Sequence, residues 1–424
     1  MDRRSFLVRT GLTFAAGALA GLPPAGAGAA IAPPRSRTQL DTWEGVRDQF
    51  SLDRQYIHLG GLLLASHPAP VRDAIEAHRQ GLDANPVVYV QDYGPGLEAA
   101  VLRAAAGYLG GQPADIALTD STTMGLGLLY NGLDLRPGQE ILTTSHDFYA
   151  THEAIEYKAA RSGASVRTVR LYGQSATAST DEIVSNLVGA VGPWTRVVAV
   201  TWVHSSTGVK LPIGQMAAAL AAINANRADA DRALLCVDGV HGFGVEDVTM
   251  ADLGCDFFVA GCHKWLFGPR GTGLVWGHPS AWPALLPTIP SFSGSGAPGR
   301  ANTPGGYHSF EHRWALTQAF EFHQQIGKYW VAARIHELNH QFKEGLAGMP
   351  GVTLHTPLDD ELSAGLICFE VAGLSPSTVI RRLRQQGIIA TTTPYATSYA
   401  RVAPGLLNTP EEVEVALGVI RALT

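Results

Sequence analysis

Residues 260–273 read Ala-Gly-Cys-His-Lys-Trp-Leu-Phe-Gly-Pro-Arg-Gly-Thr-Gly, and this stretch decides which fold the chain is expected to adopt. It continues the apolar run 256–261, which has the composition of a buried strand, and it holds Lys264 among apolar, glycine and proline residues. Partial burial lowers the pKa of a lysine, so its neutral amine can attack an aldehyde near neutral pH. The alternative is a lysine that forms an ion pair beside a turn.

A carboxylate that fits the same chemistry stands 26 residues earlier. Asp238 lies in the apolar run 234–239, and a buried carboxylate at a strand end needs a partner. A pyridinium nitrogen is one such partner, because the carboxylate keeps it protonated and makes the ring an electron sink. The other possibility is that Asp238 caps a helix. His241 follows closely and is placed to hydrogen-bond the phenolic oxygen of pyridoxal phosphate (PLP).

Three hydroxyl residues, Ser121, Thr122 and Thr123, stand at a strand-to-helix junction. Hydroxyls and free backbone N–H groups at a helix N-terminus form a site for phosphate, although an ordinary capping cluster has the same composition. Each of these polar motifs follows a short apolar run, and such runs alternate with helical patterns. This alternation is typical of an α/β protein with a parallel sheet covered on both faces, which binds ligands at the carboxyl ends of its strands. The expected strands are 115–119, 141–144, 197–203, 234–239, 256–261 and 271–277, with earlier helical patterns at 71–85 and 98–109.

In this order the segments resemble the class V aminotransferase superfamily of PLP-dependent enzymes, which includes cysteine desulfurases, kynureninases and isopenicillin N epimerase-like proteins. The resemblance covers about residues 40–424 and implies the PLP-dependent transferase fold of type I. That fold has a large PLP-binding domain with a mixed, mostly parallel seven-stranded sheet, and a smaller α+β C-terminal domain. Family behaviour also implies a homodimer with active sites at the interface. The expected divisions are an N-terminal segment (30–65), the large domain (66–310), and the interdomain helix with the C-terminal domain (311–424).

The resemblance implies a role for each matching position. Lys264 is the Schiff-base lysine, Asp238 is the partner of the pyridine nitrogen, and His241 faces the phenolic oxygen. Phe148 matches the aromatic residue that stacks on the ring, with Tyr149 or His146 as alternatives.

The phosphate and the substrate have matching positions too. Thr122 and Thr123 match the Gly-Thr-Thr phosphate loop, in which Ser121 replaces the glycine, and His263 matches a phosphate-contacting histidine. Arg401 precedes an Asn-Thr-Pro-Glu-Glu motif, and in the family the corresponding arginine grips the substrate α-carboxylate.

The chain departs from the family pattern at several positions. Gly261 stands where relatives often have a serine, and Ser205 stands where many have an asparagine near the cofactor. The usual Gly-Thr at the start of the interdomain helix is replaced by His312-Arg313. In relatives that threonine reaches the phosphate of the partner subunit, so Arg313 is a candidate for this contact. The Pro-, Gly- and Ser-rich stretch 278–310 is expected to be a mobile loop.

The reaction stays open at this stage. A desulfurase is disfavoured, because it needs a nucleophilic cysteine on a flexible loop, and Cys368 lies in an apolar run instead. All four cysteines have the surroundings of buried apolar residues. Lys264, once displaced by a substrate amine, can serve as general base for transamination, epimerisation or loss of a side-chain group. A non-catalytic binding protein of the same fold is the alternative of another class.

The N-terminus and the composition indicate where in the cell the protein is expected to be. Arg3-Arg4 precede Ser-Phe-Leu and a short apolar run, 11–20, and small residues follow, so residues 1–29 read as a twin-arginine (Tat) signal peptide for the Tat machinery. A general secretory signal is the alternative. The apolar run is shorter than the roughly 20 residues of a membrane span. The net charge of −6 does not indicate the positively charged surface that binds nucleic acid.

Export narrows the expected role. A Tat-exported chain with these motifs resembles the pyoverdine-maturation enzymes of the superfamily, which modify a glutamate attached to a siderophore precursor. We therefore expect a periplasmic enzyme that tailors the amino group of an amino acid or a peptide-linked amino acid, with an amino-acid epimerase or lyase as the alternative.

Overall fold

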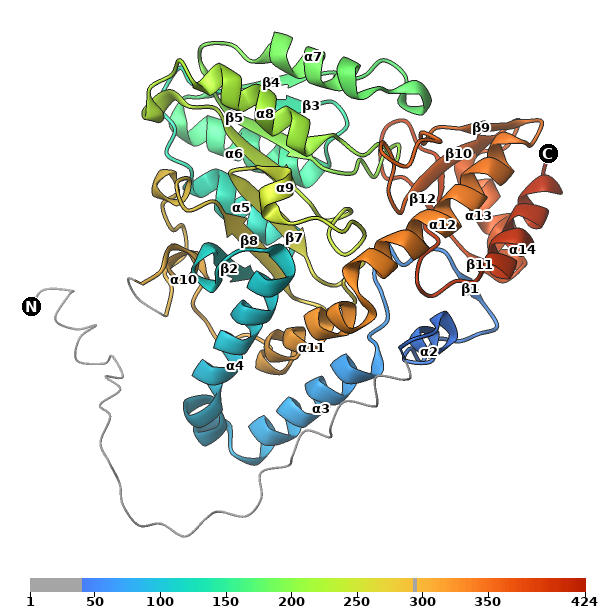
Figure 1. Ribbon diagram of the computed structural model, residues 1–424, viewed down its shortest axis with the longest axis horizontal. Helices are drawn as coiled ribbons and strands as arrows, with labels where there is room; N and C mark the ends of the chain where they lie inside the picture. The colour runs from blue at the N-terminus through green and yellow to red at the C-terminus, as the bar shows by residue number, and fades with distance from the viewer. Residues whose placement is uncertain (1–39, 293–295) are drawn as a thin grey trace, which may run out of the picture. The chain divides into compact units, whose positions relative to one another are not determined.

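The computed structural model describes residues 40–292 and 296–424, so the predicted signal peptide lies outside the described residues (Figure 1). Its largest sheet has seven strands in the order β2-β8-β7-β6-β5-β3-β4. Strand β8 is antiparallel to both of its neighbours, and the other neighbouring strands are parallel. The mixed, mostly parallel seven-stranded sheet is therefore confirmed. The strands are β2 (Ile116–Thr119), β3 (Glu140–Thr144), β4 (Ser165–Val169), β5 (Thr195–Thr201), β6 (Leu234–Asp238), β7 (Phe257–Gly261) and β8 (Gly273–Gly277).

The central strands are apolar on both sides because helices cover both faces. On β6, Leu235 and Val237 join one core cluster, while Leu234 and Cys236 join the other. Burying each large aliphatic side chain stabilises the fold by roughly 1.5–3 kcal/mol. The face that carries Leu234 and Cys236 packs on α5 (Thr122–Gly132) and α6 (Tyr149–Ser162).

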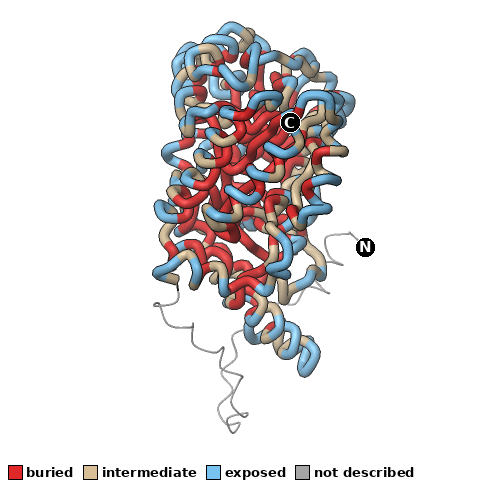
Figure 2. The backbone as a smooth tube through the Cα atoms, turned by 90° about the vertical axis from the view of Figure 1, so that its right-hand side faces the viewer, coloured by how far each residue is buried: buried red, intermediate tan, exposed pale blue. Residues whose placement is uncertain are grey.

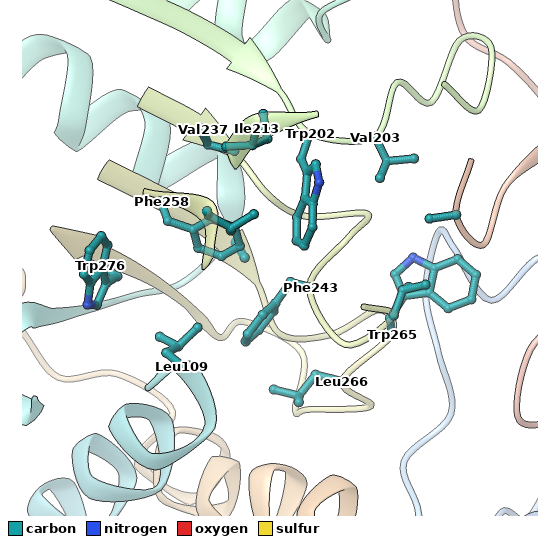
Figure 3. Packing of buried hydrophobic residues seen from close by; sticks show 14 of the residues in the cluster. Leu109, Trp202, Val203, Ile213, Val237, Phe243, Phe258, Trp265, Leu266 and Trp276 are labelled. Carbon is teal, nitrogen blue, oxygen red and sulfur yellow. The ribbon is translucent and has the colours of Figure 1, made fainter. Parts of the chain in front are cut away.

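The opposite face carries the larger apolar layer. Phe258 of β7 meets the rings of Trp202 and Phe243 edge-on, at centroid distances of 6.2 and 5.9 Å (Figure 3). Figure 2 shows buried segments through the middle of the described chain and exposed segments at its periphery. The helices of this layer are α4 (Pro86–Leu109), α7 (Thr180–Ala190), α8 (Ile213–Asn224), α9 (Met250–Leu253), α11 (Phe310–Ile326) and the start of α12 (Lys328–Ala347).

Helix α4 begins at Pro86, earlier than the helical pattern at 98–109 indicates. The helix continues through Pro95, although an internal proline costs about 3 kcal/mol. Packing on α11 accounts for the difference: a Cβ atom added at Gly94 would be in ordinary van der Waals contact with the Trp314 ring at 3.4 Å, and the Tyr89 ring lies 6.0 Å from the same ring. Tertiary contact with α11 therefore outweighs the local cost. The remaining helices before α10 are α2 (Trp43–Arg47) and α3 (Ala69–Ala84), with short 3-10 helices at Pro113–Asp115, Ser175–Thr177, Asp229–Asp231 and Trp282–Ala284.

The stretch expected to be a mobile loop contains a helix, α10 (Pro298–Asn302), that packs on the edge strand β2. Thr303 accepts a hydrogen bond from the Leu118 backbone N–H through its hydroxyl, at 3.0 Å. The same hydroxyl donates to the carbonyl of Gly299 at 3.0 Å. The expectation of a mobile loop was therefore wrong for α10, because this helix covers the otherwise unpaired edge of the sheet.

A second sheet lies in the C-terminal region. It has four strands in the order β12-β13-β10-β9, all antiparallel, and it packs with the end of α12, with α13 (Pro376–Gln385) and with α14 (Pro410–Arg421). The long helical segment breaks at Gly327, whose φ of +96° only glycine adopts readily. The predicted domain boundary at residue 310 stays a prediction. The strands are β9 (Val352–Leu354), β10 (Ile367–Val371), β12 (Thr391–Thr392) and β13 (Ala400–Val402), with a separate parallel pair β1 (Ile57–His58) and β11 (Ile388–Ile389).

Among the described residues, no helix is both long and apolar enough to cross a membrane.

Candidate active site

A cavity of about 170 Å3 opens at the carboxyl ends of β2, β3, β5, β6 and β7. Polar motifs that are far apart in sequence meet there, as expected for a parallel sheet. The lining residues that sequence reasoning singled out are Ser121, Thr122, Thr123, Phe148, Ser205, Asp238, His241, His263, Lys264 and Arg401. Those that it missed are Leu62, Leu63, Leu126, Ala150, Thr201, Val240 and Pro394.

Lys264 lies in a tight turn just beyond β7. The turn is closed by hydrogen bonds from Phe267 N to the Lys264 carbonyl (3.1 Å) and from Gly268 N to the Cys262 carbonyl (2.8 Å). Phe267 has a φ of +57°, a conformation that is unfavourable for a bulky residue. Its ring packs edge-on against Phe50 at 4.9 Å. The turn is thus held by packing, and it fixes where the lysine side chain starts.

The Lys264 side chain is partly buried beside charged and polar groups. Its Nζ lies 3.3 Å from His241 Nε2. Burial lowers the pKa of Lys264, and the Arg401 cation lowers it further, while the Asp238 carboxylate opposes this change. The neutral amine is therefore more available than in a solvated lysine.

Asp238 ends β6 and is buried, with 2% of its surface exposed. It accepts a hydrogen bond from the Val240 backbone N–H at 3.1 Å. Burial raises the pKa of Asp238, and the nearby Lys264 cation lowers it. His241 Nδ1 is also buried, and no described residue gives it a hydrogen-bond partner. Both side chains can therefore serve a ligand in the cavity.

Ser121 begins the hydroxyl cluster as the N-cap of α5, where its hydroxyl accepts from the Met124 N–H at 3.1 Å. The Thr122 hydroxyl accepts from the Gly261 N–H at 2.8 Å, so its own proton stays available to donate. The N-terminus of α5 adds the positive end of a helix dipole. This arrangement suits a phosphate group.

The close contact between α5 and the lysine turn also explains one departure from the family. A Cβ atom added at Gly261 would lie 2.9 Å from Thr122 Oγ1 and 3.0 Å from His263 Cε1. A serine there would require these neighbours to move. The glycine is thus a packing requirement of this chain.

Phe148 lines the cavity from the N-cap position of α6. Of the two alternatives for the stacking residue, Tyr149 is 56% exposed and does not line the cavity. His146 stacks instead on Tyr172, with ring centroids 4.4 Å apart. The geometry therefore favours Phe148 for contact with a ring.

Arg401 reaches the cavity from β13 of the C-terminal sheet. Its guanidinium donates to the Ser205 carbonyl at 2.8 Å, to the Thr391 hydroxyl at 3.1 Å and to the Thr392 carbonyl at 3.4 Å. Burial lowers its pKa, and no carboxylate of the described residues forms an ion pair with it. A buried cation of this kind is suited to an anionic ligand.

Sequence reasoning missed Tyr395, whose hydroxyl lies 2.7 Å from Ser205 Oγ. It also missed Leu62 and Leu63, which follow β1 in the N-terminal segment. Ala65 of that segment donates its N–H to the His263 carbonyl at 3.1 Å, which ties the segment to the lysine turn. The available signal for Tyr395 was its position close before Arg401 in a segment rich in hydroxyl residues.

Arg313 is the predicted site residue that does not line the cavity. It is buried within the chain, where its Nη2 lies 3.6 Å from Asp120 Oδ1. His308 Nδ1 lies 3.6 Å from the same carboxylate oxygen. His312 contacts the Arg270 carbonyl instead. A contact from Arg313 to a partner subunit's phosphate therefore stays a prediction.

Comparisons with known proteins agree with this geometry. The aminotransferase class-V family matches residues 67–415. Isopenicillin N epimerase of Streptomyces clavuligerus is 27% identical over 403 residues, which cover 90% of this chain and 98% of that protein. A probable cysteine desulfurase of Pseudomonas aeruginosa is 27% identical over 353 residues, which cover 78% of this chain and 82% of that protein.

Solved structures share the fold. A mutant of C-DES with glycine covalently linked to its PLP cofactor superposes with a TM-score of 0.81 at 22% identity, covering 88% of this chain and 98% of that chain. A cysteine desulfurase from Thermococcus onnurineus NA1 gives a TM-score of 0.77 at 21% identity, covering 90% of this chain and 97% of that chain. The fold is therefore that of PLP-dependent enzymes of type I. Because the family match spans well over half of its length, the chain belongs to the class V aminotransferase family of PLP-dependent enzymes.

Proposed function

We propose that this chain carries PLP on Lys264 and acts on the amino group of an α-amino acid, either free or joined to a larger molecule. The observation that carries the proposal is that the Lys264 amine and the Arg401 guanidinium line the same cavity. An amine can attack a carbonyl carbon or remove an acidic α-proton, and a guanidinium can bind a carboxylate. An α-amino acid presents the two functions on adjacent carbon atoms.

The residues of the cavity fit the cofactor. His241 Nδ1 and Thr201 Oγ1 are buried, and neither has a hydrogen-bond partner within the described part of the chain, so both are open to a ligand. The hydroxyls at the N-terminus of α5 suit a phosphate, and the Asp238 carboxylate suits a protonated ring nitrogen. When bound, PLP supplies an aldehyde that captures amines and a ring that takes up the electrons of a carbanion.

Lys264 has two tasks in this proposal. As a neutral amine it can capture the aldehyde of the cofactor, and burial favours that neutral form. When free, the Lys264 Nζ would be the general base for the proton on the substrate α-carbon. The position to which the proton returns decides between transamination and epimerisation.

Arg401 orients the substrate. Its hydrogen bonds to Ser205, Thr391 and Thr392 hold the guanidinium before any substrate arrives. A carboxylate bound there would fix the neighbouring α-carbon relative to Lys264. Preorganised positioning of this kind lowers the barrier without cost at the moment of reaction.

Transamination is the first candidate, and epimerisation or elimination is the second. The similarity to isopenicillin N epimerase over 98% of that protein favours the second. Desulfuration is disfavoured, since all four cysteines are buried and free. Burial raises the pKa of Cys368 to about 12, so the reactive thiolate is scarce at neutral pH.

The biological setting is a further part of the proposal. The twin-arginine motif at Arg3-Arg4 supports export to the periplasm, where tailoring of a siderophore-bound glutamate is a suitable reaction. A homodimer is supported by apolar side chains such as Leu63 beside the cavity, 53% exposed, and Tyr307, 87% exposed. Fusing residues 1–40 to a folded reporter tests the export route, because Arg3-Arg4→Lys-Lys should keep the reporter in the cytoplasm.

The central experiment is borohydride reduction of the purified yellow protein, followed by peptide mass mapping. The cofactor mass should appear on the peptide that contains Lys264, and Lys264→Ala should remove both the label and turnover. Lys158→Ala is the matched control, since Lys158 is a partly buried lysine of α6 that does not line the cavity. Label on another residue, or unchanged turnover in Lys264→Ala, would contradict the proposal. A labelled protein that converts no amino donor would indicate the non-catalytic alternative.

The two candidate reactions are separated by incubating the holoenzyme with amino donors, free or siderophore-bound. Formation of the pyridoxamine form supports transamination. Exchange of the α-proton with deuterated water without that form supports epimerisation.

A further inference from the structure

Ser205 and Tyr395 form a pair of hydroxyls at the edge of the cavity. Ser205 follows β5, and Tyr395 lies between β12 and β13, 190 residues later. Their oxygen atoms are 2.7 Å apart. Ser205 lines the cavity, whereas Tyr395 does not. One member of the pair thus faces the ligand, and the other lies behind it.

Either oxygen of this pair could donate the hydrogen bond, and its surroundings favour Tyr395 as the donor. Burial raises the pKa of Tyr395 to about 12, so at neutral pH the phenol keeps its proton. No other described residue accepts that proton, and the Ser205 hydroxyl has no further described partner. If Tyr395 donates to Ser205, the serine proton is left to donate into the cavity. The reverse direction would present only a serine lone pair to an anionic ligand, which is unfavourable.

Ser205 is also coupled to Arg401. Its backbone carbonyl accepts from Arg401 Nη1 at 2.8 Å, so the serine holds the guanidinium through its backbone. The guanidinium and the serine hydroxyl therefore belong to the same anion-binding corner. An asparagine at this position would donate through its amide without help. A serine donates only if its proton is not used elsewhere.

We propose that Tyr395 is a positioning residue that orients the Ser205 hydroxyl as a second donor, beside Arg401, to the α-carboxylate of the substrate. This inference rests on the proposed function, because it assigns part of the same substrate site. It implies a substrate class: the amino acid must carry both a free amino group and a free α-carboxylate. A residue joined to a larger molecule then has to be joined through its side chain.

The test compares amino acids with their decarboxylated amines on the holoenzyme. L-Alanine with ethylamine, and L-glutamate with 4-aminobutanoate, are titrated while the visible absorption of the bound cofactor is followed. Tyr395→Phe should weaken binding of the amino acid about 10-fold, the loss of one hydrogen bond to a charged group, and should change binding of the amine less than twofold. Ser205→Ala should behave alike, and the double variant should lose no more than Ser205→Ala alone.

Tyr399→Phe is the matched control, because Tyr399 lies on the same segment and stacks on His355 at 3.8 Å, away from Ser205. Ser205→Asn in the Tyr395→Phe background should recover most of the preference for the carboxylate, since an amide donates by itself. Equal weakening of acid and amine in Tyr395→Phe, or no weakening of either, would overturn the inference. A wild-type protein that lacks colour or responds to no amine would instead overturn the proposed function.

Discussion

The two sheets contribute to the cavity in different ways. The seven-stranded sheet supplies its residues from the carboxyl ends of parallel strands and the turns just beyond them, as with Asp238 at the end of β6 and Lys264 after β7. The antiparallel C-terminal sheet supplies Arg401 from inside a strand, β13. In the proposed function the first arrangement forms the cofactor side of the cavity and the second forms its substrate side. The cofactor side is made of local motifs, while the substrate side exists only where Arg401 meets Ser205, 196 residues away.

The largest effect is expected on the cofactor side. Asp238→Asn removes the charge that suits the ring nitrogen, and turnover at saturating substrate should fall about 10²–10³-fold with cofactor still attached. Asp256→Asn is the control, because Asp256 precedes β7 at the opposite end of the sheet, where it accepts from Leu235 N. If Asp238→Asn retained nearly the turnover of the wild type, the role assigned to the Asp238 carboxylate would be wrong.

A somewhat smaller effect is expected on the substrate side. Arg401→Met should lower kcat/KM for an amino acid about 100-fold, because it removes a buried donor to a carboxylate. The loss should fall mainly on KM, while attachment of the cofactor persists. Arg334→Met is the control, since Arg334 is also buried, in α12, but pairs with Glu337. If the control loses as much as Arg401→Met, general destabilisation explains the result.

The two sides should act on Lys264 in opposite directions. Capture of PLP by the apo-protein needs the neutral amine, so its rate should rise with pH and level off above the lowered pKa of Lys264. Asp238→Asn removes an anion that raises this pKa, so the plateau should be reached at lower pH. Arg401→Met removes a cation that lowers it, so the plateau should move to higher pH. Stopped-flow absorption over a pH series measures both, and a shift in the same direction for both variants would be inconsistent with this electrostatic arrangement.

The smallest effect on turnover is expected from the scaffold beneath the lysine turn, which acts on stability instead. His323 of α11 is fully buried at 5.7 Å from the Phe267 ring, and burial lowers its pKa to about 3. In the unfolded chain His323 binds a proton as the pH falls below about 6.5, whereas in the folded chain it stays neutral down to about pH 3. The free energy of unfolding therefore decreases as the pH drops from about 6.5 towards 3, by at most about 1.4 kcal/mol per pH unit.

Denaturant unfolding at several pH values tests this. His323→Gln should flatten the dependence of stability on pH in that window. His355→Gln, at a half-buried histidine paired with Glu370 in the C-terminal sheet, is the control from the other region for the loss of a histidine side chain. If the pH dependence of the free energy of unfolding changed equally in both variants, His323 would not be its specific source.

Sequence reasoning reached the cofactor side because each motif there is a short segment with its own chemistry. Lys264 in its glycine-rich turn and Asp238 at a strand end can each be recognised from a few residues next to them in the sequence. The packing of Gly261 against Thr122 and the helical order of α10 were not visible in this way. Both depend on which distant segment lies against them.

The sequence by itself determined the family, the parallel sheet and the residues that suit PLP, because hydrophobic periodicity and local turns record these features directly. Only the tertiary structure decided that Tyr395 lies behind Ser205, that Leu62 and Leu63 line the cavity, and that Arg313 pairs with Asp120 of the same chain. The physical reason is that these contacts join segments distant in the chain. Their geometry follows from how the helices and both sheets pack as a whole, and no local pattern encodes it.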